Sequence, residues 1–230
     1  MQPYIILQYP YETIQIALCN QGQILTRFQE HKFNAIALTI PHINSMLSAH
    51  GLMLKDLACI GVNVGPGPYN TLRALLTMAN GIHFASGLPL VGLSALDLLS
   101  AEHPNQPSLV IFQAFADHVF YQFKAEEKTE QGACSINELI KIIEEKPYPS
   151  SSGSTRGSSN KNSFLAIGNG AQMYQKRLME AVGNKLIFPD LIPAFNSLET
   201  LAAKTFEKIE ANQFEQNYLK PIYFEDLAKK

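Results

Sequence analysis

The segment most suggestive of chemistry is a glycine-rich turn, Gly65 to Pro68, between the apolar run Ala58–Val64 and a helical pattern. Backbone amides at a helix N-terminus after such a loop can bind phosphate. The segment lacks the Gly-Lys-Ser/Thr of a P-loop, and Asn70 replaces the third glycine of a Gly-x-Gly-x-x-Gly motif. A tight turn whose glycines allow close packing is the alternative. The weak candidates for cofactor binding are Gly65, Gly67, Asn70 and Thr71.

Other residue types that support catalysis or metal binding are poorly spaced for it. His31, His42 and His50 are eleven and eight residues apart, unlike the His-Glu-x-x-His pair that places two ligands on one helical face. The three cysteines are far apart and fit reduced thiols better than a disulfide framework: Cys19, Cys59 and Cys134. We therefore predict no metal site.

A carboxylate is missing where phosphotransferases of the actin-like kind need one. Those enzymes place an Asp at the end of the first strand, because Mg²⁺ requires anionic oxygen ligands. Here the first strand, Tyr4–Leu7, is followed by Gln8, whose amide can neither anchor Mg²⁺ by charge nor act as a general base. We predict no catalytic residue and no tightly bound cofactor. Any nucleotide would bind weakly, and only through a protein complex that contains this chain.

The elements that must position these residues begin with three short strands in residues 4–28, joined by turns. Helical spacing follows over residues 34–50, with Pro41 marking either a kink or the true start of the helix. A strand at 58–64, a helix at 71–86 and a strand at 90–92 come next. This order predicts a mixed sheet with helices packed on it. The core-facing stripe of the first helix is expected to be Ile36, Ile40, Ile43 and Leu47.

A second α/β lobe is predicted beyond the proline-rich boundary near residue 104. It would contain strands at 109–113, 118–124 and 164–168, and helices at 136–145 and 171–182. A serine-rich stretch, 149–163, has too little apolar surface to be buried and is predicted to be an exposed loop. The predicted domains are lobe one, 1–104, completed by the C-terminal helix 198–230, and lobe two, 105–197.

The amino-acid composition limits which partners the chain can bind by itself. The 230 residues include 18 Lys and Arg against 20 Asp and Glu, a net charge of −2, so the chain has no overall cationic field for a phosphate backbone. If nucleic acid is involved, a partner must supply the positive surface. No apolar run approaches the roughly 18 residues of a membrane helix, and no signal peptide is evident. These features predict a soluble, cytoplasmic protein with no membrane partner.

The glycine segment also carries a family resemblance. Gly65–Arg73 reads Gly-Pro-Gly-Pro-Tyr-Asn-Thr-Leu-Arg and resembles the Gly-Pro-Gly-Ser-Phe-Thr-Gly-Leu-Arg signature of the bacterial TsaB family. The similarity continues through Gly87–Leu96, and weaker likeness occurs at Ile167–Gly170 and Pro221–Phe224. The resemblance implies an α/β, two-lobed actin/hexokinase/Hsp70-like (ribonuclease H-like) fold with mixed sheets.

The sequence departs from the family at positions where family members carry charged residues. The first-strand Asp-Thr of the family is Gln8-Tyr9 here, and its second-lobe Asp-Ala-Arg is Gln113-Ala114-Phe115. The resemblance implies a non-catalytic scaffold, a pseudoenzyme that supports a TsaD-like paralogue in forming N6-threonylcarbamoyladenosine on tRNAs reading codons that start with A. A TsaE-like ATPase would join through the complex and tRNA would be contacted only indirectly. A homodimer remains open, and the alternative function is a residual ATPase or small-molecule kinase.

The second helix suggests a partner surface. Arg73 is the only charged residue between Asn70 and Ser86, although a surface helix normally turns charged residues outward. Either the helix is buried within its own lobe or a second apolar face packs on helices of another subunit. The resemblance favours the subunit, because TsaB and TsaD are thought to pair through equivalent helices. The predicted interface residues are Ala74, Met78, Ile82 and Ala85.

Overall fold

The computed structural model describes residues 2–126, 128–147 and 163–223 and divides the chain into two compact units. The first unit contains Met1–Leu98 and Asn196–Ile222, and the second contains Leu99–Phe195 and Tyr223–Lys230. The sequence places the boundaries after residues 104 and 197, whereas the division falls after Leu98 and Phe195. Of the predicted serine-rich loop, 149–163, residues 149–162 lie outside the described residues.

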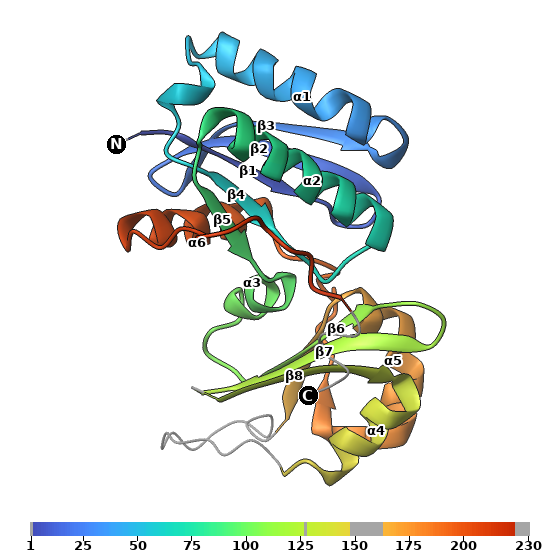
Figure 1. Cartoon of the computed structure of the whole chain (residues 1–230). Coiled ribbons are helices and arrows are strands. Elements are labelled where there is room, and N and C mark those ends of the chain that lie inside the picture. The colour runs from blue at the N-terminus through green and yellow to red at the C-terminus, as the bar shows by residue number, and fades with distance from the viewer. Residues whose placement is uncertain (1, 127, 148–162, 224–230) are drawn as a thin grey trace. The chain divides into compact units, whose positions relative to one another are not determined.

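The first unit contains a five-stranded mixed sheet in the order β3-β2-β1-β4-β5 (Figure 1). Its antiparallel part is β1 (Tyr4–Gln8), β2 (Thr13–Asn20) and β3 (Gln23–His31). Its parallel part adds β4 (Ile60–Asn63) and β5 (Leu90–Leu93). In register, Ile5 lies opposite Ile60, which lies opposite Leu90, so the central strands are apolar and covered on both faces.

The second unit repeats this sheet. Its order, β10-β9-β6-β7-β8, is the same once strands are numbered within the unit. The strands are β6 (Ser108–Gln113), β7 (His118–Ala125), β8 (Lys128–Ser135), β9 (Phe164–Ile167) and β10 (Leu186–Ile187). The predicted α/β fold with mixed sheets is confirmed, whereas β8 and β10 were not predicted.

The helices connect and cover these strands. They are α1 (Lys32–Ala49), α2 (Tyr69–Ser86), α3 (Ala95–Ala101), α4 (Ile136–Glu145), α5 (Asn169–Val182) and α6 (Leu198–Glu210). Two short 3₁₀ turns are Leu54–Asp56 and Gly183–Lys185. α1 runs through Pro41 and does not begin there. α4 begins where predicted, because the hydroxyl of Ser135 accepts from the backbone N–H of Glu138, whose carboxylate accepts from the N–H of Ser135.

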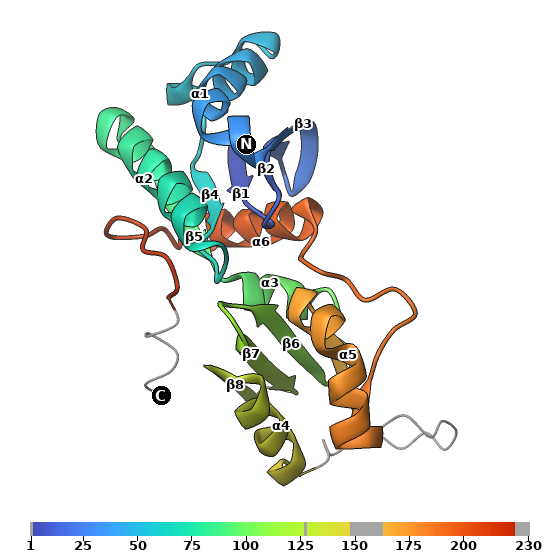
Figure 2. The same ribbon diagram turned by 90° about the vertical axis from the view of Figure 1, so that its right-hand side faces the viewer.

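Both faces of the first sheet are buried, as the period-two alternation along β1 requires. Figure 2 shows α1 and α2 on one face of the first sheet and α6 on the other. Ile5 and Leu7 face a core shared with α1 and α2, whereas Tyr4 and Ile6 face a core shared with α6. Among the side chains of α1 that the structure describes, the buried ones are Thr39, Ile43, Met46 and Leu47.

The predicted stripe of α1 is therefore wrong at Ile40, which is 39% exposed. The buried positions are spaced by four, three and one residues, which places the core-facing stripe one position before Ile40. The side chain of Ile36 lies outside the description.

Helix α6 belongs to the first unit although it follows the second along the chain. It contacts all five strands of the first sheet. A Cβ on Gly61 of β4 would lie 2.3 Å from Oγ1 of Thr205, so only glycine permits this close approach. The Thr205 hydroxyl donates to the carbonyl of Leu201 and is satisfied within its own helix. The C-terminal part of the chain thus completes the first core.

The two buried cysteines of the first unit provide a test of this packing. Burial, reinforced by the neighbouring Cys59 thiol, raises the pKa of Cys19 to about 12, and burial raises the pKa of Cys59 to about 12. Against an ordinary pKa of 9.0, the thiolate fraction at pH 8 falls roughly a thousandfold. In a Cys134→Ser background, we expect a thiol reagent to label neither cysteine quickly until urea unfolds the chain. Rapid labelling of the native protein would contradict the placement of either cysteine.

Candidate functional site

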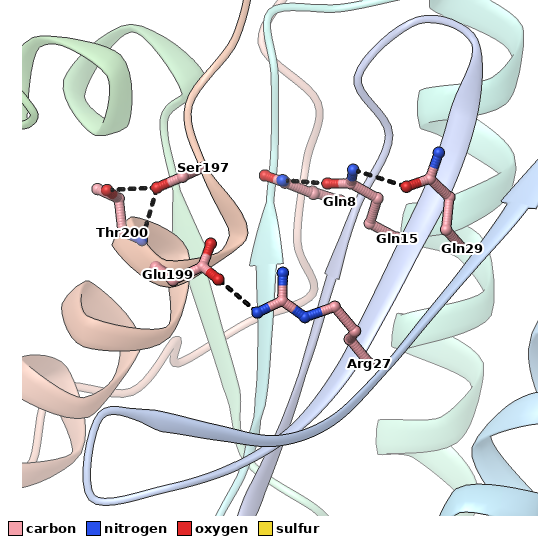
Figure 3. Close-up of polar contacts among 7 residues, drawn as sticks. All are labelled: Gln8, Gln15, Arg27, Gln29, Ser197, Glu199 and Thr200. Carbon is pink, nitrogen blue, oxygen red and sulfur yellow. Dashed lines mark hydrogen bonds and ion pairs between the residues drawn. The ribbon is translucent and has the colours of Figure 1, made fainter.

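The carboxyl end of β1 contains a chain of uncharged side-chain amides. Gln8 is 1% exposed, and its Nε2 donates to Oε1 of Gln15 on β2 at 2.7 Å. Nε2 of Gln15 donates in turn to Oε1 of Gln29 on β3 at 3.3 Å, at the exposed end of the chain (Figure 3). Gln8, the neutral residue at the end of the first strand, is therefore held by its neighbours on the same sheet.

The amide chain continues to a residue that the sequence analysis did not single out. Nδ2 of Asn196 donates to Oε1 of Gln8 at 2.8 Å, and Oδ1 of Asn196 accepts from Nδ2 of Asn63 at 3.1 Å. Oδ1 of Asn63 accepts from the backbone N–H of Gly65 at 2.9 Å. One continuous set of hydrogen bonds therefore joins β3 to the glycine turn. Every group in it is neutral, and both polar atoms of the Gln8 side chain have partners.

The residues after Asn196 fix the start of α6. The hydroxyl of Ser197 accepts from the backbone N–H of Thr200 at 3.1 Å, which caps the helix. Glu199 pairs with Arg27 of β3 (Figure 3). Burial raises the pKa of Glu199, but its own backbone hydrogen bond and Arg27 outweigh this, so that the pKa is lowered overall. The pair is mostly exposed and is expected to contribute little to stability.

The glycine turn between β4 and α2 is tight. Gly65 has φ of +95°, and a Cβ there would lie 2.6 Å from Cδ2 of Leu72. Its carbonyl accepts from the N–H of Ala95 at 2.7 Å. Of the residues 65–68, two are prolines without an N–H, and Gly65 donates its own to Asn63. The turn therefore has few amide donors for a phosphate. The other two candidates lie on α2, where Asn70 is exposed and Thr71 half-buried.

The second unit also ends its first strand in glutamine, which here bonds to an asparagine through its backbone N–H. β6 ends at Gln113, whose backbone N–H donates to Oδ1 of Asn169 at 3.0 Å. Asn169 follows Gly168, which has φ of +102° and would place a Cβ 2.2 Å from the carbonyl oxygen of Ile111. In both units the first strand of the sheet ends in glutamine. In both, a closely packed glycine turn precedes a helix, which is α2 in the first unit and α5 in the second. These turns have a clear structural role.

The predicted partner residues lie along one flank of α2. Ala74, Met78 and Ile82 are half-buried, and the last two pack against the core shared with α1. Ala85 is exposed, and the neighbouring Phe84 is 79% exposed. The flank is thus partly covered within its own unit, and its end at Ala85 is accessible.

The described ranges contain neither a metal-binding cluster nor a membrane-spanning helix. In residues 2–126, 128–147 and 163–223, no three His, Cys, Asp or Glu side chains form a group that could hold a metal ion. No helix within the same ranges is both long and apolar enough to cross a membrane.

The sequence was next compared with known proteins. Residues 34–224 match the family described as TsaD, tRNA N6-adenosine threonylcarbamoyltransferase. The chain belongs to this family. It is also 22% identical over 182 residues to the tRNA threonylcarbamoyladenosine biosynthesis protein TsaB of Bacillus subtilis (strain 168), covering 75% of this chain and 73% of the relative. TsaB of Escherichia coli (strain K12) is 26% identical over 85 residues, 37% of each protein. The predicted resemblance to TsaB is confirmed.

Two solved structures from Pseudomonas aeruginosa share the fold. One is an uncharacterized protein with similarity to peptidase YeaZ, with a TM-score of 0.70, and the other is YeaZ, with a TM-score of 0.66. Each is 17% identical, and each comparison covers 97% of this chain and 100% of the other. At this identity the likeness concerns the fold.

Enzymes with the predicted actin-like fold bind magnesium and a nucleotide, but the residues of this member do not fit that ligand. The first strand ends in Gln8, a neutral amide that is already hydrogen-bonded on both polar atoms. The glycine turn has few free amide donors, and its Gly65 N–H is used internally. The end of β1 and the glycine turn therefore lack the charged ligand, and offer few of the amide donors, that binding of a magnesium nucleotide requires.

The amide chain predicts an asymmetric response to mutation. Gln8→Leu should lower the free energy of unfolding by about 1–3 kcal/mol, because it leaves buried polar partners such as Asn196 without Gln8. Gln29→Ala, at the exposed end of the same chain, should stay within about 0.5 kcal/mol of the parent. Urea unfolding followed by circular dichroism measures both. Equal effects would show that the buried hydrogen bonds contribute nothing beyond those at the surface.

Proposed function

We propose that this chain is a TsaB-type accessory subunit that supports a TsaD-type catalytic subunit in forming N6-threonylcarbamoyladenosine on tRNA. It belongs to the TsaD family and resembles proteins named for the biosynthesis of this nucleoside. The observation that carries a non-catalytic role is the buried Gln8, a neutral amide fully engaged with Gln15 and Asn196. A side chain so placed offers neither a metal ligand with charge nor a general base.

This division of labour assigns the chemistry to the partner. The TsaD-type subunit would transfer the threonylcarbamoyl group to tRNAs that read codons starting with A, and a TsaE-like ATPase would act through the same complex. Because the net charge is −2, the positive surface for tRNA would come from the partner, and contact with tRNA through this chain would be indirect. The assembly would act in the cytoplasm.

The proposed partner surface is the flank of α2 formed by Ala74, Met78, Ile82 and Ala85. Small residues permit a partner helix to approach closely, and the exposed Phe84 adds apolar area beside Ala85. Between Asn70 and Ser86, Arg73 is the only charged residue, so the helix carries little charge that would have to be desolvated on docking. A second copy of the chain could use the same surface, giving a homodimer in the absence of the partner.

Substitution of the exposed end of this surface tests the complex. We expect Ala85→Arg to weaken binding to the cognate TsaD-type protein at least about tenfold, because a charge and a long side chain enter an apolar contact. Ala181→Arg, at an exposed position of α5 in the second unit, is the matched control and should bind normally. Calorimetric titration with a thermal melt measures affinity and folding together. Normal binding by a folded Ala85→Arg protein would place the interface elsewhere.

Titration with Mg-ATP distinguishes this function from a residual ATPase or kinase. We expect millimolar affinity or none for the isolated chain, since the glycine turn has few amide donors and no carboxylate ends β1. Gly67→Ala is the informative variant, because a Cβ there meets nothing within 4 Å and leaves the fold intact. Micromolar binding that Gly67→Ala abolishes would instead support the enzyme.

A further inference from the structure

The C-terminal strap, residues 213–222, is bound to the first unit in the manner of a peptide. It follows α6 after a turn at Asn212, where φ is +52°, and contains no helix or strand (Figure 1). Its residues are mostly exposed, with Leu219 the only buried one. The strap is therefore held by a few specific contacts and not by structure of its own.

Backbone hydrogen bonds attach the strap to the edge of the first sheet. β5 is the edge strand, and the carbonyl of Leu90 accepts from the N–H of Glu215 at 2.9 Å. The Glu215 carboxylate accepts from the N–H of Gly92 at 3.3 Å. Farther along, the N–H of Ile222 donates to the carbonyl of Val64 at 3.0 Å. An extended segment that pairs with an exposed strand edge is a recurring form of peptide recognition.

Asn80 of α2 holds the centre of the strap through both atoms of its amide. Its Nδ2 donates to the carbonyl of Leu219 at 3.0 Å, and its Oδ1 accepts from the N–H of the same residue at 2.8 Å. A side-chain amide used in this way replaces the donor and acceptor that a neighbouring strand would offer. The amide therefore recognises the backbone N–H and carbonyl of one residue in an extended chain.

The side chain of Leu219 fills a site that glycine creates. Leu219 is 5% exposed, and a Cβ on Gly92 would lie 2.8 Å from its Cδ2. The same Cβ would lie 3.1 Å from Cγ1 of Val64, so Gly92 leaves room for the leucine beside Val64. Leu219 joins the core shared with α1 and α2, whereas Phe214 packs against the core shared with α6. The strap thus crosses the β5 edge between two anchors on opposite faces of the sheet.

We propose that Val64, Asn80, Leu90 and Gly92 form a binding site for an extended peptide, occupied reversibly by the strap of this chain. The site recognises a buried leucine, the backbone of that residue, and a glutamate four residues before it. The strap also has a ring contact between Tyr218 and His83, and hydrogen bonds between Gln213 and Lys208. Because it contains no helix or strand, its release breaks contacts of this kind and leaves the sheet paired.

The test uses the complete chain with a specific protease site inserted in the exposed turn between Asn212 and Gln213. After cleavage, a fluorescein-labelled peptide of residues 213–222 is titrated and its anisotropy measured. We expect saturable binding that unlabelled peptide reverses. A Leu219→Ala peptide should bind about tenfold more weakly or worse, because the apolar anchor is lost. An Asn217→Ala peptide, altered at an exposed position, should bind within about twofold of the parent.

Two protein controls make the test specific. Uncut protein should bind the peptide far more weakly, because its tethered strap competes at a high effective concentration. An Asn80→Ala protein, cut in the same way, should lose affinity for the parent peptide. The proposal is overturned if cut and uncut proteins bind equally, or if the Leu219→Ala peptide binds as the parent does. It is also overturned if cleavage unfolds the first unit by circular dichroism, since the strap would then be an integral part of the core.

Discussion

The hydrogen bond between the buried amides of Gln8 and Asn196 is the constraint on which the first unit depends. It joins the end of the first strand to a residue 188 positions later in the chain. Two amides buried away from water must satisfy each other, because an unpaired polar group in that position would be costly. Since Ser197 caps α6 directly afterwards, this bond places α6 and, through it, the C-terminal strap. Closure of the first core is therefore linked to a polar contact at the site where enzymes of this fold carry charge.

The second unit also ends its first strand in a glutamine, Gln113 of β6. Both units have the same strand order, and both have a glycine turn whose backbone packs closely on neighbouring groups. In each case the glycines are explained by packing: Gly65 against Leu72, and Gly168 against the backbone of Ile111. In both units the glycine turns serve to hold the fold together, and in the first unit the side chain of Gln8 does so as well.

The sequence predicted those parts of the fold that local patterns determine. The Ser135–Glu138 pair marks the start of α4, and the glycine signature identified the strand-turn-helix of β4 and α2 together with the family. It missed β8, because the polar residues of this edge strand lack a clear apolar alternation. It placed Ile40 on the buried face of α1, where tertiary packing selects Thr39 instead. Asn196 and Asn80 were not found, because their partners lie 188 and 139 residues away and no local spacing indicates such contacts.

We propose that this chain promotes tRNA modification without performing the transfer. The most direct test is reconstitution with the cognate TsaD-type and TsaE-type proteins, a threonylcarbamoyl donor and tRNA, with N6-threonylcarbamoyladenosine quantified by mass spectrometry of the digested tRNA. The account predicts that the modified nucleoside forms with the complete set, falls to background when this chain is omitted, and is not formed by this chain alone. Modification by this chain without the TsaD-type subunit, or full modification in its absence, would contradict the account.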